Sequence, residues 1–123
     1  MLKNSKLMAF VATTDAAKAK SFYGGKLGLE LVSEDGFAVV FNAHGTTLRV
    51  AIAKEITPAR YTVLGWEVTD IEAAARDLQA AGIPLERYPF IQQDELAIWH
   101  APGGARVAWF KDPEGNILSI SQH

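Results

Sequence analysis

Two stretches of the chain show the same order of hydrophobic and polar positions. Apolar, β-prone residues fill positions 7–13 and 61–68, and an alanine-rich segment with helical spacing follows each of them. Thr14-Asp15 stands before the first helical segment and Thr69-Asp70 before the second. An aspartate at this position accepts hydrogen bonds from backbone N–H groups of the first helical turn, so Asp15 and Asp70 are predicted N-caps. The repeat predicts two modules of one kind.

A glycine follows each predicted helix. Gly28 and Gly82 come directly after the last helical positions, and glycine readily takes the left-handed conformation that ends a helix. In the first helix Ala19, Phe22 and Tyr23 recur at three- and four-residue spacing, so their face is predicted to be buried.

Extended segments follow both helices, and the second half offers one more of them than the first. In the first half they are residues 30–33, 37–42 and 47–53, and in the second half 84–90, 96–100, 105–110 and 117–121. The extra segment predicts an added hairpin that turns at 101–104. Trp66 alternates away from Glu67 in the strand pattern, so Trp66 is assigned to the core.

The length fits a single domain over residues 1–123, with module one at about 5–53 and module two at about 61–122. Residues 54–60, which include Pro58, read as a linker too short to be a mobile tether, so the modules are expected to pack together.

Charge and composition limit the kinds of partner and of site that the chain can have. Twelve Lys and Arg stand against fourteen Asp and Glu, a net charge of −2, and no run of basic residues favours nucleic-acid binding. The absence of cysteine excludes disulfides and thiolate sites and suits a reducing compartment. The apolar run 7–12 is too short for a signal sequence or a membrane span, so a cytoplasmic protein without a membrane segment is expected.

Three motifs carry a resemblance to a known family. They resemble the vicinal oxygen chelate superfamily, which includes glyoxalases, bleomycin-resistance proteins and extradiol dioxygenases. The resemblance implies an α+β fold of paired βαβββ modules that form a cupped, partly open β-barrel-like sheet with helices on the outside, and a homodimer. The motifs are Ser-Phe-Tyr at 21–23, Leu-Gly-Leu at 27–29 and Asp-Pro-Glu-Gly-Asn at 112–116.

The resemblance also implies a divalent metal held at four positions, which fall near Met8, Arg49, Val63 and Ser119 of this chain. A divalent metal prefers carboxylate or imidazole ligands, and these residues supply neither. We therefore expect no metal and no other cofactor, although a different alignment of the four positions would leave a divalent metal open.

Strand alternation predicts which side chains line the cavity. Phe10, Arg49, Glu67 and Ser119 share the predicted cavity face, and Trp99 lies close by. These five are the candidate ligand-binding residues. Arg49 and Glu67 have two interpretations that hold together, an internal ion pair and a recognition site for a polar ligand group. Glu67 and His100 are the candidate catalytic base and acid.

The leading hypothesis is a metal-free protein of the glyoxalase/bleomycin-resistance type that binds an aromatic or amphiphilic small molecule in the sheet cavity. The competing hypothesis is a glyoxalase-like lyase or isomerase that acts on a small oxygenated metabolite. A third interpretation is a partner-binding module whose cavity is filled by its own side chains.

Overall fold

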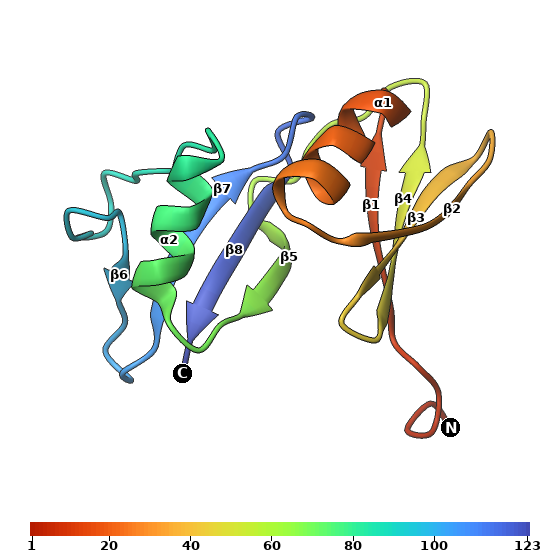
Figure 1. Cartoon of the computed structure of the whole chain (residues 1–123). Coiled ribbons are helices and arrows are strands. Elements are labelled where there is room, and N and C mark those ends of the chain that lie inside the picture. The colour runs from red at the N-terminus through yellow and green to blue at the C-terminus, as the bar shows by residue number, and fades with distance from the viewer. The chain divides into compact units, whose positions relative to one another are not determined.

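The repeat in the sequence is a repeat in the structure. A computed structural model describes residues 1–123, which form two units, Met1–Thr57 and Pro58–His123 (Figure 1). Each unit contains one strand, a helical segment and three further strands, in that order. The predicted α+β fold of paired βαβββ modules is confirmed, although neither sheet closes into a barrel.

Unit one is a four-stranded sheet with the strand order β1-β4-β3-β2. Strands β1 and β4 run parallel, and the other neighbours are antiparallel. The elements are β1 (Met8–Thr13), α1 (Ala16–Ala19), η1 (Lys20–Lys26), β2 (Glu30–Glu34), β3 (Ala38–Ala43) and β4 (Thr46–Ile52).

Alternation along these strands sorts the side chains of unit one into two faces. Val11, Val50 and Val39 lie opposite one another on adjacent strands, and all three are buried. Tyr23 of η1 is also buried, and its ring centroid lies 6.0 Å from that of Phe41 in β3. One face of the sheet therefore forms the core of unit one together with the helical segment.

The first helical segment begins as predicted and then changes pitch. The Asp15 carboxylate accepts a hydrogen bond from the Lys18 N–H at 3.1 Å. From Lys20–Lys26 the segment is a π-helix, and its end is marked by the bond from the Leu27 N–H to the Phe22 carbonyl at 2.9 Å. The wider turn is a difference from the ordinary helix that the sequence predicts.

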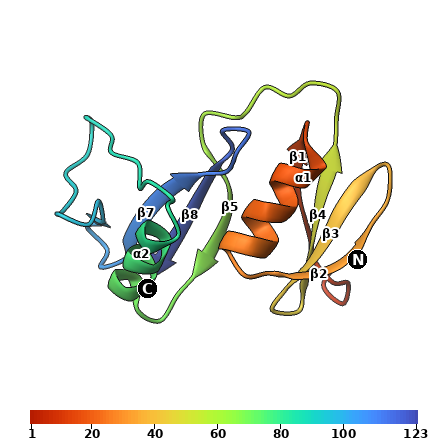
Figure 2. The ribbon, with the colours of Figure 1, turned by 45° about the horizontal axis from the view of Figure 1, so that its top comes forward.

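Unit two repeats the topology with the strand order β5-β8-β7-β6. Strands β5 and β8 run parallel, and the other neighbours are antiparallel. Helix α2 lies against β7 and β8, as Figures 1 and 2 show. The elements are β5 (Thr62–Glu67), α2 (Ile71–Ala80), β6 (Trp99–His100), β7 (Arg106–Lys111) and β8 (Ile117–Gln122).

The core of unit two lies between the sheet and α2. The helix buries Ile71, Ala75 and Leu78, and the sheet buries Ala108, Phe110, Leu118 and Ile120. Trp66 lies on this face, as predicted, and stacks on Phe110 with ring centroids 6.3 Å apart. No helix of the structure is long and apolar enough to span a membrane.

The hairpin predicted to turn at 101–104 is confirmed, because β6 and β7 pair antiparallel on either side of this turn. The fourth extended segment predicted in the second half is wrong, because only three strands follow α2. Residues 84–90 form no strand, because Pro84 and Pro89 have no N–H to donate to a neighbouring strand. The main link of this segment to the sheet is one hydrogen bond, which the Glu86 N–H donates to the Trp109 carbonyl at 2.8 Å. The segment 96–100 shrinks to Trp99–His100, since Ala97 takes a φ of 63°.

The last turn is organised by one carboxylate. Asp112 is only 6% exposed. Its Oδ1 accepts the N–H groups of Glu114 at 3.0 Å and Asn116 at 2.9 Å, and its Oδ2 accepts the Asn116 side-chain amide at 2.8 Å. The Asp-Pro-Glu-Gly-Asn motif thus fixes the entry into β8.

Replacing Asp112 with alanine removes these acceptors and leaves buried N–H groups without partners. We expect Asp112→Ala to lower the free energy of unfolding by about 2–4 kcal/mol. Denaturant unfolding measures this effect. Asp77→Ala, an exposed position on α2, is the matched control, and an equal loss in both variants would contradict this account of the turn.

Candidate functional site

The face of the unit-two sheet opposite α2 carries the candidate site. Strand register places two rows of side chains across this open face. One row is Glu67, Ser121, Val107 and Trp99, and the other is Gly65, Ser119 and Trp109. The prediction that Glu67 and Ser119 share a face is therefore confirmed, and Trp99 lies on the same face.

A bulge near the start of β5 adds a polar group to the open face. Thr62 pairs with Ile117 and Leu64 with Leu118, so β5 holds one extra residue between these pairs. The bulge turns Thr62 toward Trp109, whose indole N–H donates to the Thr62 hydroxyl at 3.1 Å. This bond joins β5 to β7 across the open face.

Gly65 keeps the middle of the open face shallow. A Cβ atom at this position would lie 2.5 Å from the Ser119 Oγ and 3.3 Å from the Ser119 carbonyl oxygen. A larger residue at this position would therefore require Ser119 to shift. The open face is therefore shallow at Gly65, beside the much larger Trp109 side chain.

An aromatic pocket of about 330 Å³ opens on this face. Neighbouring rings of the pocket are in contact. The ring centroid of Trp109 lies 6.0 Å from that of Trp99 and 5.6 Å from that of Tyr88, and the Tyr88 and Phe90 centroids are 5.4 Å apart. The volume lies at the lower end of the range for small-molecule sites. The pocket is lined by Arg60, Tyr61, Thr62, Tyr88, Phe90, Ile91, Trp99, Trp109 and Ile117.

The loop that carries Tyr88 and Phe90 is held in place by Gln93. The Tyr88 N–H donates to the Gln93 side-chain oxygen at 2.8 Å. The Gln93 amide nitrogen donates to the carbonyls of Glu86 at 2.9 Å and Ala97 at 2.8 Å. The aromatic wall is thus tied to the segment that leads into Trp99.

Arg60 is the one charged side chain among the pocket residues. Burial raises the pKa of Tyr88, and the nearby Glu86 carboxylate adds to this effect, so its phenol is neutral at pH 7. The pocket therefore combines apolar rings with a single positive charge.

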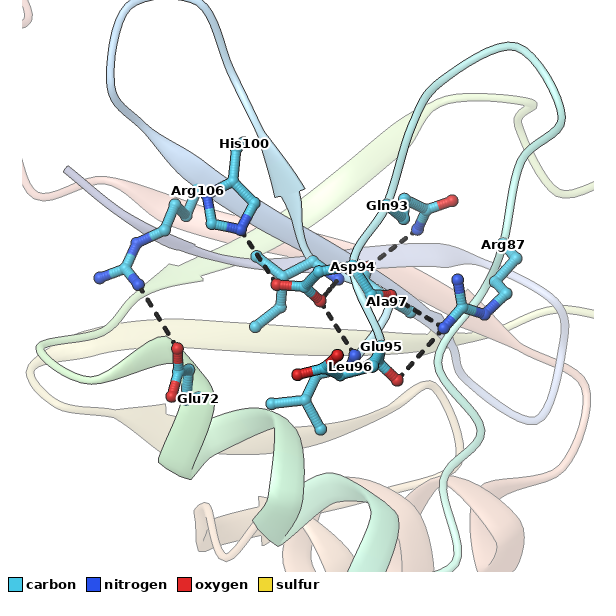
Figure 3. A network of polar contacts seen from close by, with 10 residues as sticks. Glu72, Arg87, Gln93, Asp94, Glu95, Leu96, Ala97, His100 and Arg106 are labelled. Carbon is cyan, nitrogen blue, oxygen red and sulfur yellow. Dashed lines mark hydrogen bonds and ion pairs between the residues drawn. The ribbon is translucent and has the colours of Figure 1, made fainter.

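His100 belongs to a different polar cluster (Figure 3). Its Nε2 lies 3.0 Å from the Asp94 Oδ2, while the Asp94 Oδ1 accepts the N–H groups of Leu96 at 2.9 Å and Ile98 at 3.0 Å. The Arg87 guanidinium donates to the Asp94 carbonyl at 2.9 Å.

A second cavity of about 390 Å³ adjoins this cluster and shares Trp99 with the aromatic pocket. It is the more polar of the two, because glutamine side chains, the Asp94 carboxylate and the His100 imidazole line it together with Pro102.

The two catalytic candidates do not come together. Glu67 shares the open face with Trp99, whereas His100 pairs with Arg106 on the opposite face, where Arg106 forms an ion pair with Glu72 of α2 at 3.9 Å. Glu67 and His100 therefore lie on opposite faces of the sheet, because adjacent strand residues point to opposite faces, and their roles as catalytic base and acid stay predictions.

Phe10 and Arg49 lie in unit one, opposite each other on β1 and β4. Phe10 is 58% exposed. Backbone N–H groups of Phe37 and Ala38 lower the pKa of Asp35, and the Arg49 charge contributes to the same shift. An Arg49–Glu67 pair and a shared site with Trp99 stay predictions.

The four positions at which the resemblance implies metal ligands do not fit a divalent cation. Met8, Arg49, Val63 and Ser119 provide a thioether, a guanidinium, an alkyl group and a hydroxyl, and hard divalent cations prefer carboxylate oxygen and imidazole nitrogen. No group of three His, Cys, Asp or Glu side chains gathers as a candidate metal site. No step of chemistry is therefore assigned to a metal at these positions.

Of the five candidate ligand-binding residues, only Trp99 lines the aromatic pocket, and Arg60 and Thr62 are among the lining residues that sequence patterns missed. Arg60 stands in the predicted linker. Regular strand alternation would place Thr62 on the same face as Leu64, and only the bulge brings it to the open face. A charged residue directly before an apolar strand was the only signal for Arg60.

The fold defines a class of proteins built from two βαβββ modules, and comparison with known proteins identifies the family. The model of the Glyoxalase/Bleomycin resistance protein/Dioxygenase superfamily matches residues 7–120. The chain belongs to this superfamily. No curated protein sequence matches the chain.

Solved structures share the fold at low sequence identity. A glyoxalase family protein from Enterococcus faecalis is 20% identical with a TM-score of 0.76, over 98% of this chain and 99% of that one. A lactoylglutathione lyase from Agrobacterium tumefaciens is 20% identical with a TM-score of 0.75, over 98% and 95%. A superfamily member from Sphaerobacter thermophilus is 23% identical with a TM-score of 0.74, over 100% of both chains.

The Asp94 cluster predicts a pH dependence. Burial raises the pKa of Asp94, but hydrogen bonds from His100, Ile98 and Leu96 outweigh it, and the net pKa is lowered. A lowered folded-state pKa stabilises the fold above the unfolded pKa, and this contribution is lost as pH falls through the folded value. In an acid titration we expect the amide resonances of Leu96 and Ile98 to shift together below about pH 4.

Asp94→Asn keeps an oxygen acceptor but does not titrate, so this variant should lack the shared transition. His100 and Arg87 contact Asp94 directly, and the other charged residues drawn with this cluster in Figure 3 are Glu72, Glu95 and Arg106. His100→Gln tests the imidazole separately. An unchanged transition in Asp94→Asn would contradict the assignment to Asp94.

Proposed function

We propose that this protein is a metal-free small-molecule binding protein that holds an aromatic or amphiphilic ligand against the open face of the unit-two sheet. The observation that carries the proposal is the aromatic pocket, in which Tyr88, Phe90, Trp99 and Trp109 surround a space of about 330 Å³. Stacked or edge-to-face ring contacts contribute about 0.5–1.5 kcal/mol each beyond burial. We further propose that the protein acts as a homodimer in the cytoplasm.

The residues of the pocket favour binding over catalysis. None of the side chains that line it is a carboxylate or an imidazole, so the pocket holds no evident general base at neutral pH. Ser119, Glu67 and His100 lie outside the lining. The lining of the pocket instead supplies flat apolar surface, which suits a ligand that is bound without chemical change.

A second candidate function is a lyase or isomerase of the glyoxalase type. The observation that favours it is the His100 imidazole, which Asp94 holds at 3.0 Å beside the second cavity. Mass spectrometry of recovered ligand separates the two functions, because a binding protein returns its ligand unaltered.

Fluorescence titration with naphthalene-2-carboxamide, a neutral flat probe, tests the binding proposal. We expect saturable quenching in chelator-treated protein and a dissociation constant about fivefold to tenfold larger in Trp99→Ala, because one ring contact is lost.

Trp66→Phe is the matched control for this titration, because Trp66 stacks on Phe110 at the opposite face of the sheet. It should bind like the parent protein. Quenching that does not saturate, or equal weakening in Trp99→Ala and Trp66→Phe, would overturn the proposal.

A further inference from the structure

Arg60 is positioned to recognise a negative charge. It lines the aromatic pocket at the residue before Tyr61, just outside β5. It forms no ion pair with any carboxylate of unit two. Its guanidinium is permanently charged and presents several N–H donors in a plane, which suits a carboxylate.

Thr62 adds a second donor at the same end of the pocket. Its hydroxyl accepts the Trp109 indole N–H at 3.1 Å, and a hydroxyl that accepts one bond still has its own hydrogen to donate. Arg60 and Thr62 both line the pocket and are separated by one residue. Two donors therefore lie at the edge of an apolar, aromatic surface.

The lining offers no matching group for a ligand cation. Glu86, a nearby carboxylate, lies outside the lining and forms an ion pair with Lys111 at 3.5 Å. Aromatic faces do attract cations, but here a permanent positive charge lies among them. The charge balance thus favours an anionic ligand.

We propose that the pocket selects a planar aromatic carboxylate, with its rings against Trp99 and Trp109 and its carboxylate on Arg60 and the Thr62 hydroxyl. This inference deepens the proposed binding function and rests on it. It excludes neutral and cationic aromatics as preferred ligands.

Three probes of one shape test the charge preference: naphthalene-2-carboxylate, naphthalene-2-carboxamide and naphthalen-2-ylmethylammonium. We expect the carboxylate to bind the parent protein about tenfold more tightly than the carboxamide, and the ammonium to bind most weakly. In Arg60→Gln the carboxylate should lose this advantage of about tenfold, while carboxamide binding changes by less than about twofold.

Arg76→Gln is the matched control, because Arg76 is exposed on α2 and lies outside the pocket lining. It removes the same charge from unit two and should leave the selectivity unchanged. Equal loss in Arg76→Gln and Arg60→Gln would mean that net charge alone attracts the ligand, which overturns the inference.

The outcomes separate this inference from the function on which it rests. If carboxylate and carboxamide bind equally, or the ammonium binds most tightly, the inference fails and the binding function stands. If no probe binds at all, both fail. Selectivity for the carboxylate that depends on Arg60 supports both.

Discussion

The hydrogen bond from the Trp109 indole to the Thr62 hydroxyl, 3.1 Å long, is the contact on which the aromatic pocket depends. It forms because a bulge in β5 turns Thr62 onto the open face. The bond joins Thr62 to the Trp109 ring, which contacts Trp99 and Tyr88, and Arg60 lines the same pocket two residues before Thr62. Without it the indole N–H would have to find another partner or remain exposed to water.

The two units show how one repeated topology yields different surfaces. In unit one β2 begins soon after Gly28 and completes the sheet. In unit two the prolines at 84 and 89 prevent strand formation, and residues 84–98 form an irregular segment pinned by Gln93 and Asp94. This segment supplies Tyr88 and Phe90 to the pocket. The function proposed for unit two therefore comes from its departure from the repeat.

Local patterns predicted most of the fold, and long-range contacts decided the rest. Asp70 and Gly82 mark a helix by local rules, and the structure gives Asp70 its capping bond and Gly82 a φ of 79°. Alternation placed Ser119 and Glu67 correctly. The bulge at Thr62 depends on pairing with Ile117, 55 residues away, which no local pattern encodes. Local pattern does not show that His100 lies on the face opposite Glu67, because position along the chain does not reveal which face a two-residue edge strand presents.

We propose that aromatic surface, rather than a metal, supplies the binding site of this protein. Elemental analysis of protein purified without chelators, combined with thermal unfolding in added nickel, zinc, manganese or iron(II), tests it most directly. A metal that binds the native state raises the unfolding midpoint by mass action. The account predicts no near-stoichiometric metal and an unchanged midpoint, whereas a near-stoichiometric metal with a clear rise in the midpoint would contradict it.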